Sequence, residues 1–278
     1  MPKNTKLGLL AVLGIWLTAG LALPFVNVLS MFTPAQLMVL RGGVAALIVL
    51  LAVRYRPARP DKYAWAIMLV LPFATLGLYQ GIRYWGAGPT LIILTTSPVI
   101  NLLVSVFLGN KISRAAITGL VLMFGGVVLA RWGGHFNWTG FAWSVLASVM
   151  SGVLYEFLAR SKTGSMQKCI LAYIGMAMLG FIVGFKDSWG ALADGRLVLV
   201  VVAFAFIGGF LYWIANVVAF KNLRTLEASV LAQGETPAVI LGAWLFLGEH
   251  LTLFQWLGVF IALSGAWYLS NNLTKPKS

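Results

Sequence analysis

The sequence predicts an all-α integral membrane protein with ten transmembrane helices, arranged as two inverted five-helix repeats around a central cavity. Composition, the spacing of apolar segments and an internal repeat lead to this prediction. Of the 278 residues, 60% are hydrophobic and only 10% are charged. Soluble domains carry about 25% charged residues, and a chain of this length has too little interior to hide so much apolar surface from water. The expected solvent is therefore lipid.

The apolar segments have the length that a membrane-spanning helix needs, about 20 residues. In chain order, the expected helices are 7–29, 34–53, 63–82, 89–108, 113–131, 138–159, 167–185, 196–220, 229–247 and 252–270. The joints between them are short, and the longest polar one is 186–195. The first segment is too long for a signal peptide and no cleavage pattern follows it, so we interpret it as a membrane helix.

The basic residues predict the orientation of these helices, because Lys and Arg favour cytoplasmic joints. With a cytoplasmic N-terminus, 15 of the 20 basic residues fall in inside joints and Arg41 falls within a helix. The outside joints then hold four: Arg83, Arg131, Lys186 and Arg196. This asymmetry predicts that both termini are cytoplasmic and favours an even number of spans.

Several other classes of protein fit the sequence poorly. The net charge of +13 would suggest a nucleic-acid partner in a soluble protein, but here the basic residues mark helix ends, and we expect none. Cys169 is the single cysteine, and His135 and His250 lie far apart, so we expect no disulfide, metal or cofactor. The chain contains no phosphate-binding loop, HExxH or GxSxG motif, and therefore no candidate catalytic residue.

An internal repeat relates residues 97–126, SPVINLLVSVFLGNKISRAAITGLVLMFGG, to residues 236–265, TPAVILGAWLFLGEHLTLFQWLGVFIALSG. A gapless offset of 139 aligns Pro98 with Pro237, Gly119 with Gly258, and Gly126 with Gly265. Proline and glycine set backbone shape, so the match reflects structure rather than shared hydrophobicity. It divides the chain into halves 1–136 and 137–278. Five helices per half give opposite orientations, an arrangement typical of secondary transporters with a site near the bilayer midplane.

The repeated ending FLGEHLTLFQWLGVFIALSG, preceded by a Ser/Thr-Pro helix in each half, resembles the EamA type of the drug/metabolite transporter superfamily. The first copy departs from that pattern, with Asn110-Lys111 in place of the Glu-containing turn. The pattern of aromatic residues is also similar to the YddG aromatic amino acid exporters of bacterial inner membranes. The resemblance implies a ten-helix basket in the inner membrane that exports small metabolites, amino acids among them. One chain holds both halves, so a monomer is sufficient. The expected partners are the lipid bilayer and the small-molecule substrate, and no protein partner is required.

Polar groups and prolines within the spans are candidates for the substrate cavity, since such groups in membranes usually face a bundle interior or water. The candidates are Trp16, Pro24, Asn27, Tyr79, Gln80, Ser97, Pro98, Asn101, Tyr155, Glu156, Tyr212, Asn216, Gln233, Glu235 and Pro237. Pro98 and Pro237 are expected to kink the middle of their helices towards the interior, or else only to shape the bundle.

Three charged residues within the spans have alternative interpretations. Glu235 is a substrate or proton handle facing the cavity, or a structural residue that holds two helices together. Glu156 has the same alternatives and could also reach the nearby inside surface. Arg41 either binds a carboxylate or extends its head group to the outer interface, and the adjacent glycines favour the second interpretation.

The sequence thus favours a secondary transporter that exports amino acids, particularly aromatic and other large apolar ones, by alternating access. A broad exporter of amphiphilic cations is the main alternative, with Glu235 and Glu156 as counter-charges. An enzyme acting on lipid-linked substrates would need clustered catalytic groups, and the seven acidic residues are scattered. A purely structural subunit does not account for the intramembrane Glu, Asn and Gln, which are costly in lipid.

Overall fold

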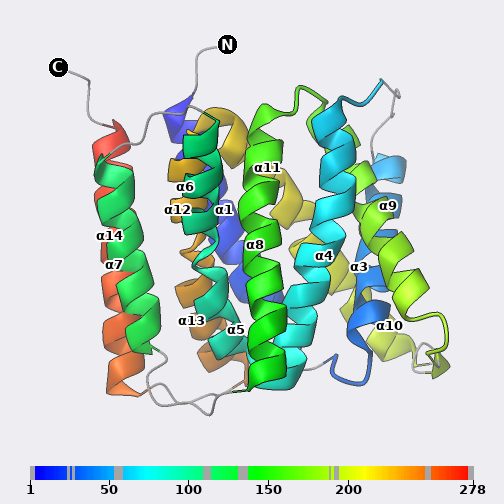
Figure 1. Ribbon diagram of the computed structural model, residues 1–278. Coiled ribbons are helices and arrows are strands. Elements are labelled where there is room, and N and C mark those ends of the chain that lie inside the picture. Colours follow the sequence, from blue (N-terminus) through cyan, green and yellow to red (C-terminus); the bar gives the residue numbers. More distant parts are fainter. Residues whose placement is uncertain are drawn as a thin grey trace.

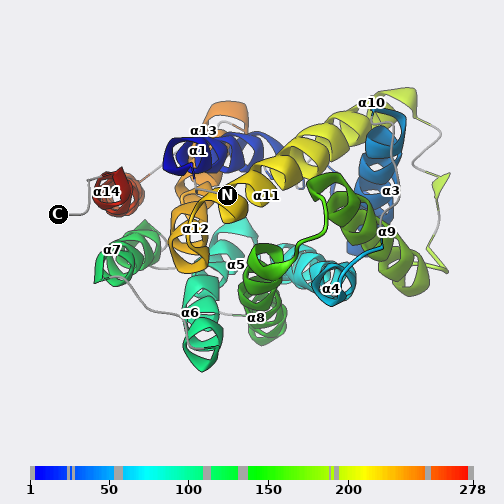
Figure 2. The same ribbon diagram turned by 90° about the horizontal axis from the view of Figure 1, so that it is seen from above.

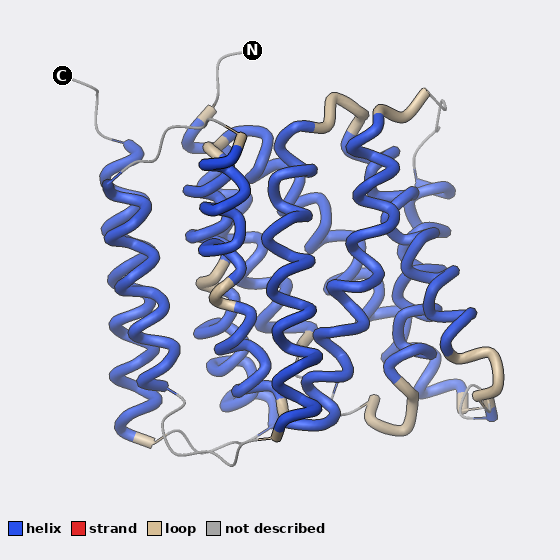
Figure 3. The backbone as a smooth tube through the Cα atoms, viewed as in Figure 1, coloured by secondary structure: helices blue, strands red, loops and turns tan. Residues whose placement is uncertain are grey.

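The computed structural model describes residues 4–23, 26, 29–52, 59–108, 114–130, 137–187, 189–190, 194–247 and 252–274. Within these ranges, every regular element is a helix (Figures 1 and 3). The elements are α1 (Thr5–Ala22), α3 (Pro34–Ala52), α4 (Lys62–Trp85), α5 (Ala87–Leu94), α6 (Ser97–Phe107), α7 (Arg114–Ala130), α8 (Trp138–Arg160), α9 (Ser165–Val183), α10 (Gly195–Phe204), η2 (Ala205–Leu211), α11 (Tyr212–Asn222), α12 (Thr225–Ala232), α13 (Glu235–Leu247) and α14 (Leu253–Thr274).

Six helical stretches in the described residues are long and apolar enough to cross a membrane. They are Thr5–Ala22, Pro34–Leu51, Lys62–Trp85, Trp138–Arg160, Ser165–Val183 and Gly195–Asn222. Two shorter apolar stretches, Ile117–Gly126 and Trp256–Leu269, belong to α7 and α14. An all-helical fold with several apolar spans is therefore confirmed.

Two expected helices are each broken in the middle. The predicted helix 89–108 is α5 followed by α6, with a turn at Thr95–Thr96 that we call the first break. The predicted helix 229–247 is α12 followed by α13, with a turn at Gln233–Gly234 that we call the second break. The turn at each break ends one half-helix and begins the next.

The expectation that Pro98 and Pro237 kink continuous helices is wrong. Pro98 is the second residue of α6, and Pro237 is the third residue of α13. In the first turn of a helix the backbone N–H has no intrahelical acceptor, so a proline there removes no hydrogen bond. Each proline therefore begins a half-helix instead of distorting a complete one.

Close helix contacts depend on glycine. α4 packs extensively on α8, and α3 on α9. A Cβ on Gly77 would lie 2.7 Å from the backbone oxygen of Trp143, and one on Gly180 would lie 2.7 Å from that of Ala35. Only glycine lets backbones approach this closely in a membrane bundle. The α3, α4, α8 and α9 helices are consequently held together by backbone contacts.

The α7 and α14 helices form a second close pair (Figure 1). Gly126 of α7 approaches Ala262, and Gly119 of α7 approaches Leu269. Residue numbers therefore rise along α7 as they fall along α14, which means that the two helices are antiparallel. Seen from above, the two broken helices lie between this pair and the group of α3, α4, α9 and α10 (Figure 2).

Asp61 links the start of α4 to the joint between α8 and α9. Its carboxylate accepts hydrogen bonds from the backbone N–H of Ala64 (2.8 Å), Lys162 (2.6 Å) and Thr163 (3.0 Å), and from the Ser161 hydroxyl (3.1 Å). Burial alone would raise the pKa of Asp61, but the hydrogen bonds outweigh it and hold the pKa below its usual value. The residue thus caps α4 and ties its start to the joint after α8.

Candidate functional site

A cavity lies in the middle of the bundle, among α1, α3, α4, α8, α9, α11 and the start of α13. Most of its wall is leucine, alanine and aromatic side chains. Arg41 and Glu235, both buried, also line it, at 8% and 3% exposure. Charged groups are costly in this environment unless they are compensated, so this arrangement distinguishes the cavity from ordinary helix packing.

Arg41 is held by a tyrosine and by the π-helical element η2. Its Nη1 donates a hydrogen bond to the Tyr79 hydroxyl at 2.9 Å, and its Nη2 donates to the carbonyl oxygen of Gly208. The guanidinium also lies over the rings of Phe204 and Tyr212, 5.7 and 5.9 Å from their centroids. These contacts fix the cation at the cavity wall. Short π-helical elements are often found at functional sites, and here η2 supplies a carbonyl that positions Arg41.

Glu235 is the first residue of α13, directly after the second break. The Tyr212 hydroxyl donates a hydrogen bond to its Oε2 at 2.8 Å. Asn216, one turn further along α11, donates to the Tyr212 carbonyl at 2.9 Å. A carboxylate near a helix N-terminus is favoured by the helix dipole. Tyr212 therefore contacts both charged groups, Arg41 through its ring and Glu235 through its hydroxyl.

Aromatic pairs support the walls of the cavity. Tyr155 stacks on Phe220 with ring centroids 4.7 Å apart and an interplanar angle of 16°. Tyr173 meets Trp213 edge to face at 5.8 Å, and its hydroxyl donates to the Gly209 carbonyl at 2.7 Å. Such pairs add stability beyond the burial of apolar area, so they keep the rings at defined positions.

The two breaks meet beside the cavity at a group of polar residues that we call the seam, namely Ser97, Asn101, Ser229 and Gln233. Gln233 Nε2 donates to Ser97 Oγ at 3.2 Å, and Ser229 Oγ donates to Asn101 Oδ1 at 3.3 Å. In lipid, irregular backbone is tolerated where protein or cavity water satisfies it. The seam supplies polar side chains at the point where both helices lose their regular hydrogen bonds.

A family model matches most of the chain. The model of the EamA-like transporter family matches residues 6–132 and again residues 138–271. The chain belongs to the EamA-like transporter family. It is accordingly a multi-pass membrane protein of a transport family, as the resemblance of its repeated ending implied.

Two individual proteins are distantly similar to this EamA-like chain. It is 28% identical over 220 residues to a probable terminal-alkyne amino-acid exporter of Streptantibioticus cattleyicolor, an alignment that covers 73% of this chain and 72% of the relative. A solved crystal structure superimposes with a TM-score of 0.78 at 17% identity, covering 98% of each chain. At that identity, the second comparison shows a shared fold and nothing about substrate.

The residues expected for the site fall into three groups in this EamA-like fold. Four of them line the cavity: Tyr155, Tyr212, Asn216 and Glu235. Six lie at the breaks or against them: Trp16, Ser97, Pro98, Asn101, Gln233 and Pro237. Trp16 belongs here because its indole N–H donates to the Leu231 carbonyl at 2.8 Å, at the end of α12.

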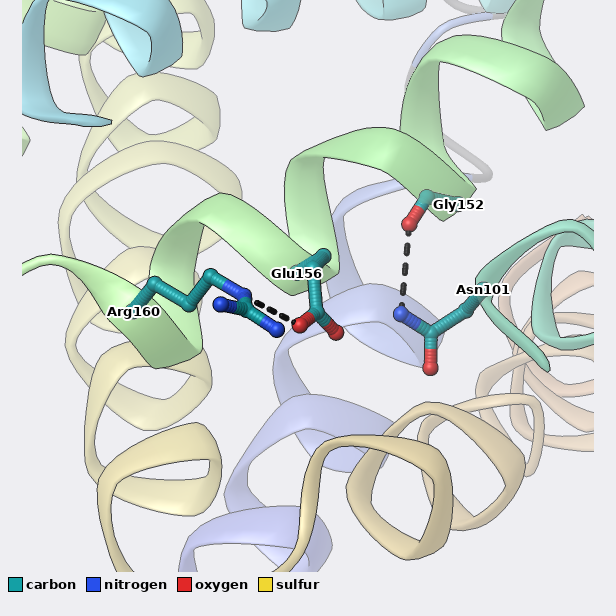
Figure 4. A network of polar contacts seen from close by, with 4 residues as sticks. All are labelled: Asn101, Gly152, Glu156 and Arg160. Carbon is teal, nitrogen blue, oxygen red and sulfur yellow. Dashed lines mark hydrogen bonds and ion pairs between the residues drawn. The ribbon is translucent and has the colours of Figure 1, made fainter. Parts of the chain in front are cut away.

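The remaining expected residues lie elsewhere. Tyr79 is buried behind Arg41, and Gln80 is half-buried on α4, outside the described cavity lining. Glu156 is 1% exposed and forms an ion pair with Arg160 at 2.6 Å, one helical turn away on α8 (Figure 4). Pro24 and Asn27 lie outside the described residues.

Arg41 is the residue whose position the sequence did not indicate. The favoured expectation, that it extends to the outer interface, is wrong, because its side chain is buried and lines the cavity. A signal was present, since an arginine in the middle of an apolar span must find polar partners. Its partners come from η2 and α4, which no local pattern connects to α3. No group of three or more potential metal ligands was found among the described residues.

Proposed function

We propose that this protein is a secondary transporter of the bacterial inner membrane that exports amino acids with aromatic and other large apolar side chains. The observation that carries the proposal is an apolar cavity at the middle of the bundle, beside two broken helices, that contains one buried cation and one buried carboxylate. Ligand sites of this kind, apolar with a few placed polar groups, bind small molecules.

In this proposal, residues 1–136 and 137–278 form inverted repeats of five transmembrane helices each. The repeat offset of 139 maps α5 (87–94) onto 226–233, and α12 occupies 225–232. The two breaks are therefore equivalent positions in the two halves. The antiparallel pairing of α7 with α14 supports the same relation, since these helices are also equivalent. Discontinuous helices at the interface of inverted repeats are typical of transporter sites.

The proposed orientation has both termini in the cytoplasm. The first turn of α1 and the last turn of α14 lie at the same end of the bundle (Figure 1), in agreement with an even number of crossings. The joint that follows α8, with Lys162, lies at that end as well, on the side that the basic residues predict to be cytoplasmic. Transport would proceed by alternating exposure of the cavity to the two sides, driven by a substrate or ion gradient.

Two features support amino acids as the substrate class. The distant relative from Streptantibioticus cattleyicolor is named as an amino-acid exporter. The aromatic residues Tyr155, Tyr173 and Trp213 line the cavity, where their rings would favour flat apolar side chains. Amphiphilic cations remain the second candidate because the Glu235 carboxylate could pair with an amine.

Transport by the purified protein in liposomes tests the proposal. Radiolabelled phenylalanine or tryptophan should accumulate and be competed by the other, with and without imposed pH and potential gradients. Thr75→Trp should fill the cavity and abolish transport, because Thr75 lines it and is 5% exposed. Leu69 lies on the same helix and is 66% exposed, so Leu69→Trp should leave transport intact. Transport of cations but of no amino acid would favour the second candidate.

A further inference from the structure

We infer that the cavity recognises the zwitterionic head group of an α-amino acid, with Arg41 binding the carboxylate and Glu235 binding the ammonium. The inference rests on the proposed function and adds to it the residues that select the substrate. Its basis is that the two side chains carry opposite charges, line one cavity and are both more than nine-tenths buried.

Arg41 has an unused donor. Its two terminal nitrogens bond to Tyr79 and Gly208, but Nε is buried and has no hydrogen-bond partner in the described part of the chain. A buried donor without a partner costs about 1–3 kcal/mol. A carboxylate accepts two parallel hydrogen bonds from a guanidinium, which adds both strength and directional specificity. Arg41 lines the cavity and has one donor without a partner among the described residues, so a substrate carboxylate could complete the hydrogen bonds of its guanidinium.

Glu235 likewise lacks a charged partner among the described residues. Within the described residues, the other buried glutamates form ion pairs, Glu156 with Arg160 and Glu227 with Arg224. Glu235 forms none, and its hydrogen bond from Tyr212 reaches only Oε2. A buried carboxylate needs a charged or strongly polar partner to offset its lost hydration. A substrate ammonium can supply that partner at Oε1.

Tyr212 sets the relation between the two groups. Its ring centroid is 5.9 Å from the Arg41 guanidinium carbon, and its hydroxyl is 2.8 Å from Glu235 Oε2. No ion pair joins Arg41 to Glu235, so among the described residues the two charges do not neutralise each other through a direct contact. An α-amino acid presents an ammonium and a carboxylate on the same carbon atom and can contact both. Its side chain would then lie against the leucines of α4 and α8.

This assignment separates α-amino acids from compounds that share the side chain. Phenethylamine lacks the carboxylate, and 3-phenylpropionate lacks the ammonium. Each would leave one buried charge uncompensated. Sites built to hydrogen-bond a polar group can reject analogues lacking it by factors far larger than those for a missing methylene. Wild-type protein should therefore prefer phenylalanine to both analogues by about tenfold or more.

Competition against labelled phenylalanine in proteoliposomes tests the inference, with binding to detergent-purified protein as a second readout. Arg41→Gln should weaken the binding of phenylalanine by about tenfold or more while leaving the binding of phenethylamine nearly unchanged. The preference for a ligand with a carboxylate is then lost. Glu235→Gln should do the reverse, weakening phenylalanine and sparing 3-phenylpropionate. Arg160→Gln and Glu227→Gln are matched controls: each removes one charge of an ion pair that has a buried glutamate and a partly exposed arginine, outside the described cavity lining, and the preference should persist.

The outcomes separate the two proposals. The head-group assignment is overturned if both cavity variants lose the binding of all three ligands in equal measure, or if their ligand preference is unchanged. Either result leaves the proposal of amino-acid transport by the wild type standing. Absence of amino-acid transport and binding in the wild type overturns the proposed function itself. Should either variant fail to fold, Arg41→Lys and Glu235→Asp keep the charge but alter its geometry. They should then reduce the same preferences by a smaller factor, and unchanged preferences in both would contradict the assignment.

Discussion

The Gln233 side chain at the second break donates a hydrogen bond to the hydroxyl of Ser97, the first residue of α6, although 136 positions separate them in the chain. Both residues are buried, at 1% and 0% exposure. The contact connects the broken helix of one half to that of the other. Several measurable consequences follow from this contact and from others in the bundle.

Removal of either partner should loosen the seam. Ser97→Ala and Gln233→Leu should each lower stability by about 0.5–1.5 kcal/mol, the net contribution of one hydrogen bond, since Gln233 Nε2 also donates to the Ser229 carbonyl at 3.2 Å and keeps that bond when Ser97 is replaced. The double variant should be less destabilised than the sum of the two. Thermal unfolding in detergent, analysed as a double-mutant cycle, measures this coupling. Ser264→Ala serves as control, since its hydroxyl is exposed and bonds only within its own helix; full additivity would argue against the contact.

Trp16 and Gly234 should also behave as a coupled pair. A Cβ on residue 234 would overlap the Trp16 ring, so Gly234→Ala should destabilise the protein by about 1–3 kcal/mol. Trp16→Ala removes the obstructing ring along with its hydrogen bond to Leu231. Gly234→Ala should therefore cost much less in the Trp16→Ala background. An equal cost in both backgrounds, measured by thermal unfolding, would show that the ring is not the obstacle.

The contact between α7 and α14 provides a test with an adjacent control. At residue 126 a Cβ would lie 2.5 Å from the Ala262 amide nitrogen and 2.6 Å from the Gly258 carbonyl, both backbone atoms that cannot rotate away. Gly126→Ala should therefore destabilise the pair by about 1–3 kcal/mol. Gly125 has open space around it, so Gly125→Ala should be neutral or stabilise by up to about 1 kcal/mol. Melting temperatures of the two variants should move in opposite directions or differ clearly.

Asp61 should give the protein an acid-sensitive contribution to stability. Its folded pKa is lowered, so the carboxylate stabilises the folded state fully above the unfolded pKa of about 3.9. That contribution is lost as the pH falls through the folded pKa. Asp61→Ala should therefore lower the melting temperature near neutral pH, and its difference from wild type should narrow below about pH 4.

Asp194→Ala is the matched control for Asp61. Asp194 caps α10 through one hydrogen bond to the Arg196 amide at an exposed position, whereas Asp61 also connects two joints. Its loss should cost about 0.5–2 kcal/mol at most. Equal effects of the two substitutions would mean that Asp61 acts only as a helix cap.

Single-cysteine labelling tests the proposed orientation. Cys169 is the single cysteine and is buried, so Cys169→Ala gives a background without a native thiol. Single cysteines are then placed at Asn4, Lys162 and Lys186. A membrane-impermeant thiol reagent applied from the periplasmic side should label Lys186→Cys and leave Asn4→Cys and Lys162→Cys unlabelled until the membrane is opened. The reverse pattern would invert the proposed topology while leaving the fold intact.

Much of the helix layout could be predicted because its signals are local. The expected helix 138–159 is observed as Trp138–Arg160, and Asn137 caps its start by accepting a hydrogen bond from Gly140. The number of apolar residues was enough to predict it. The same holds for α4, expected at 63–82 and observed as Lys62–Trp85, with Asp61 as its cap.

The breaks had a local signal in Pro98 and Pro237, which begin the half-helices that follow them, but we interpreted these prolines as kinks. The position of Arg41 depends on distant partners, which explains why the sequence did not predict it. Thr95 and Thr96 are not strong helix breakers, and the first break is accompanied by contacts between α6 and the second half of the chain. Arg41 is drawn inward by Tyr79 and by a Gly208 carbonyl, 38 and 167 positions away in the chain. Local patterns report propensity, whereas the position of Arg41 results from tertiary contacts.

The glycine contacts of α3, α4, α8 and α9 have a consequence for motion. Backbones in direct van der Waals contact leave no room for the helices to shift against each other, so these four helices should move as one rigid unit, which we call the frame. The broken helices face each other through side-chain hydrogen bonds, each worth about 1 kcal/mol net, which thermal energy can exchange for water. If the cavity opens first to one side of the membrane and then to the other, the side-chain contacts of the seam should therefore exchange more readily than the contacts within the frame.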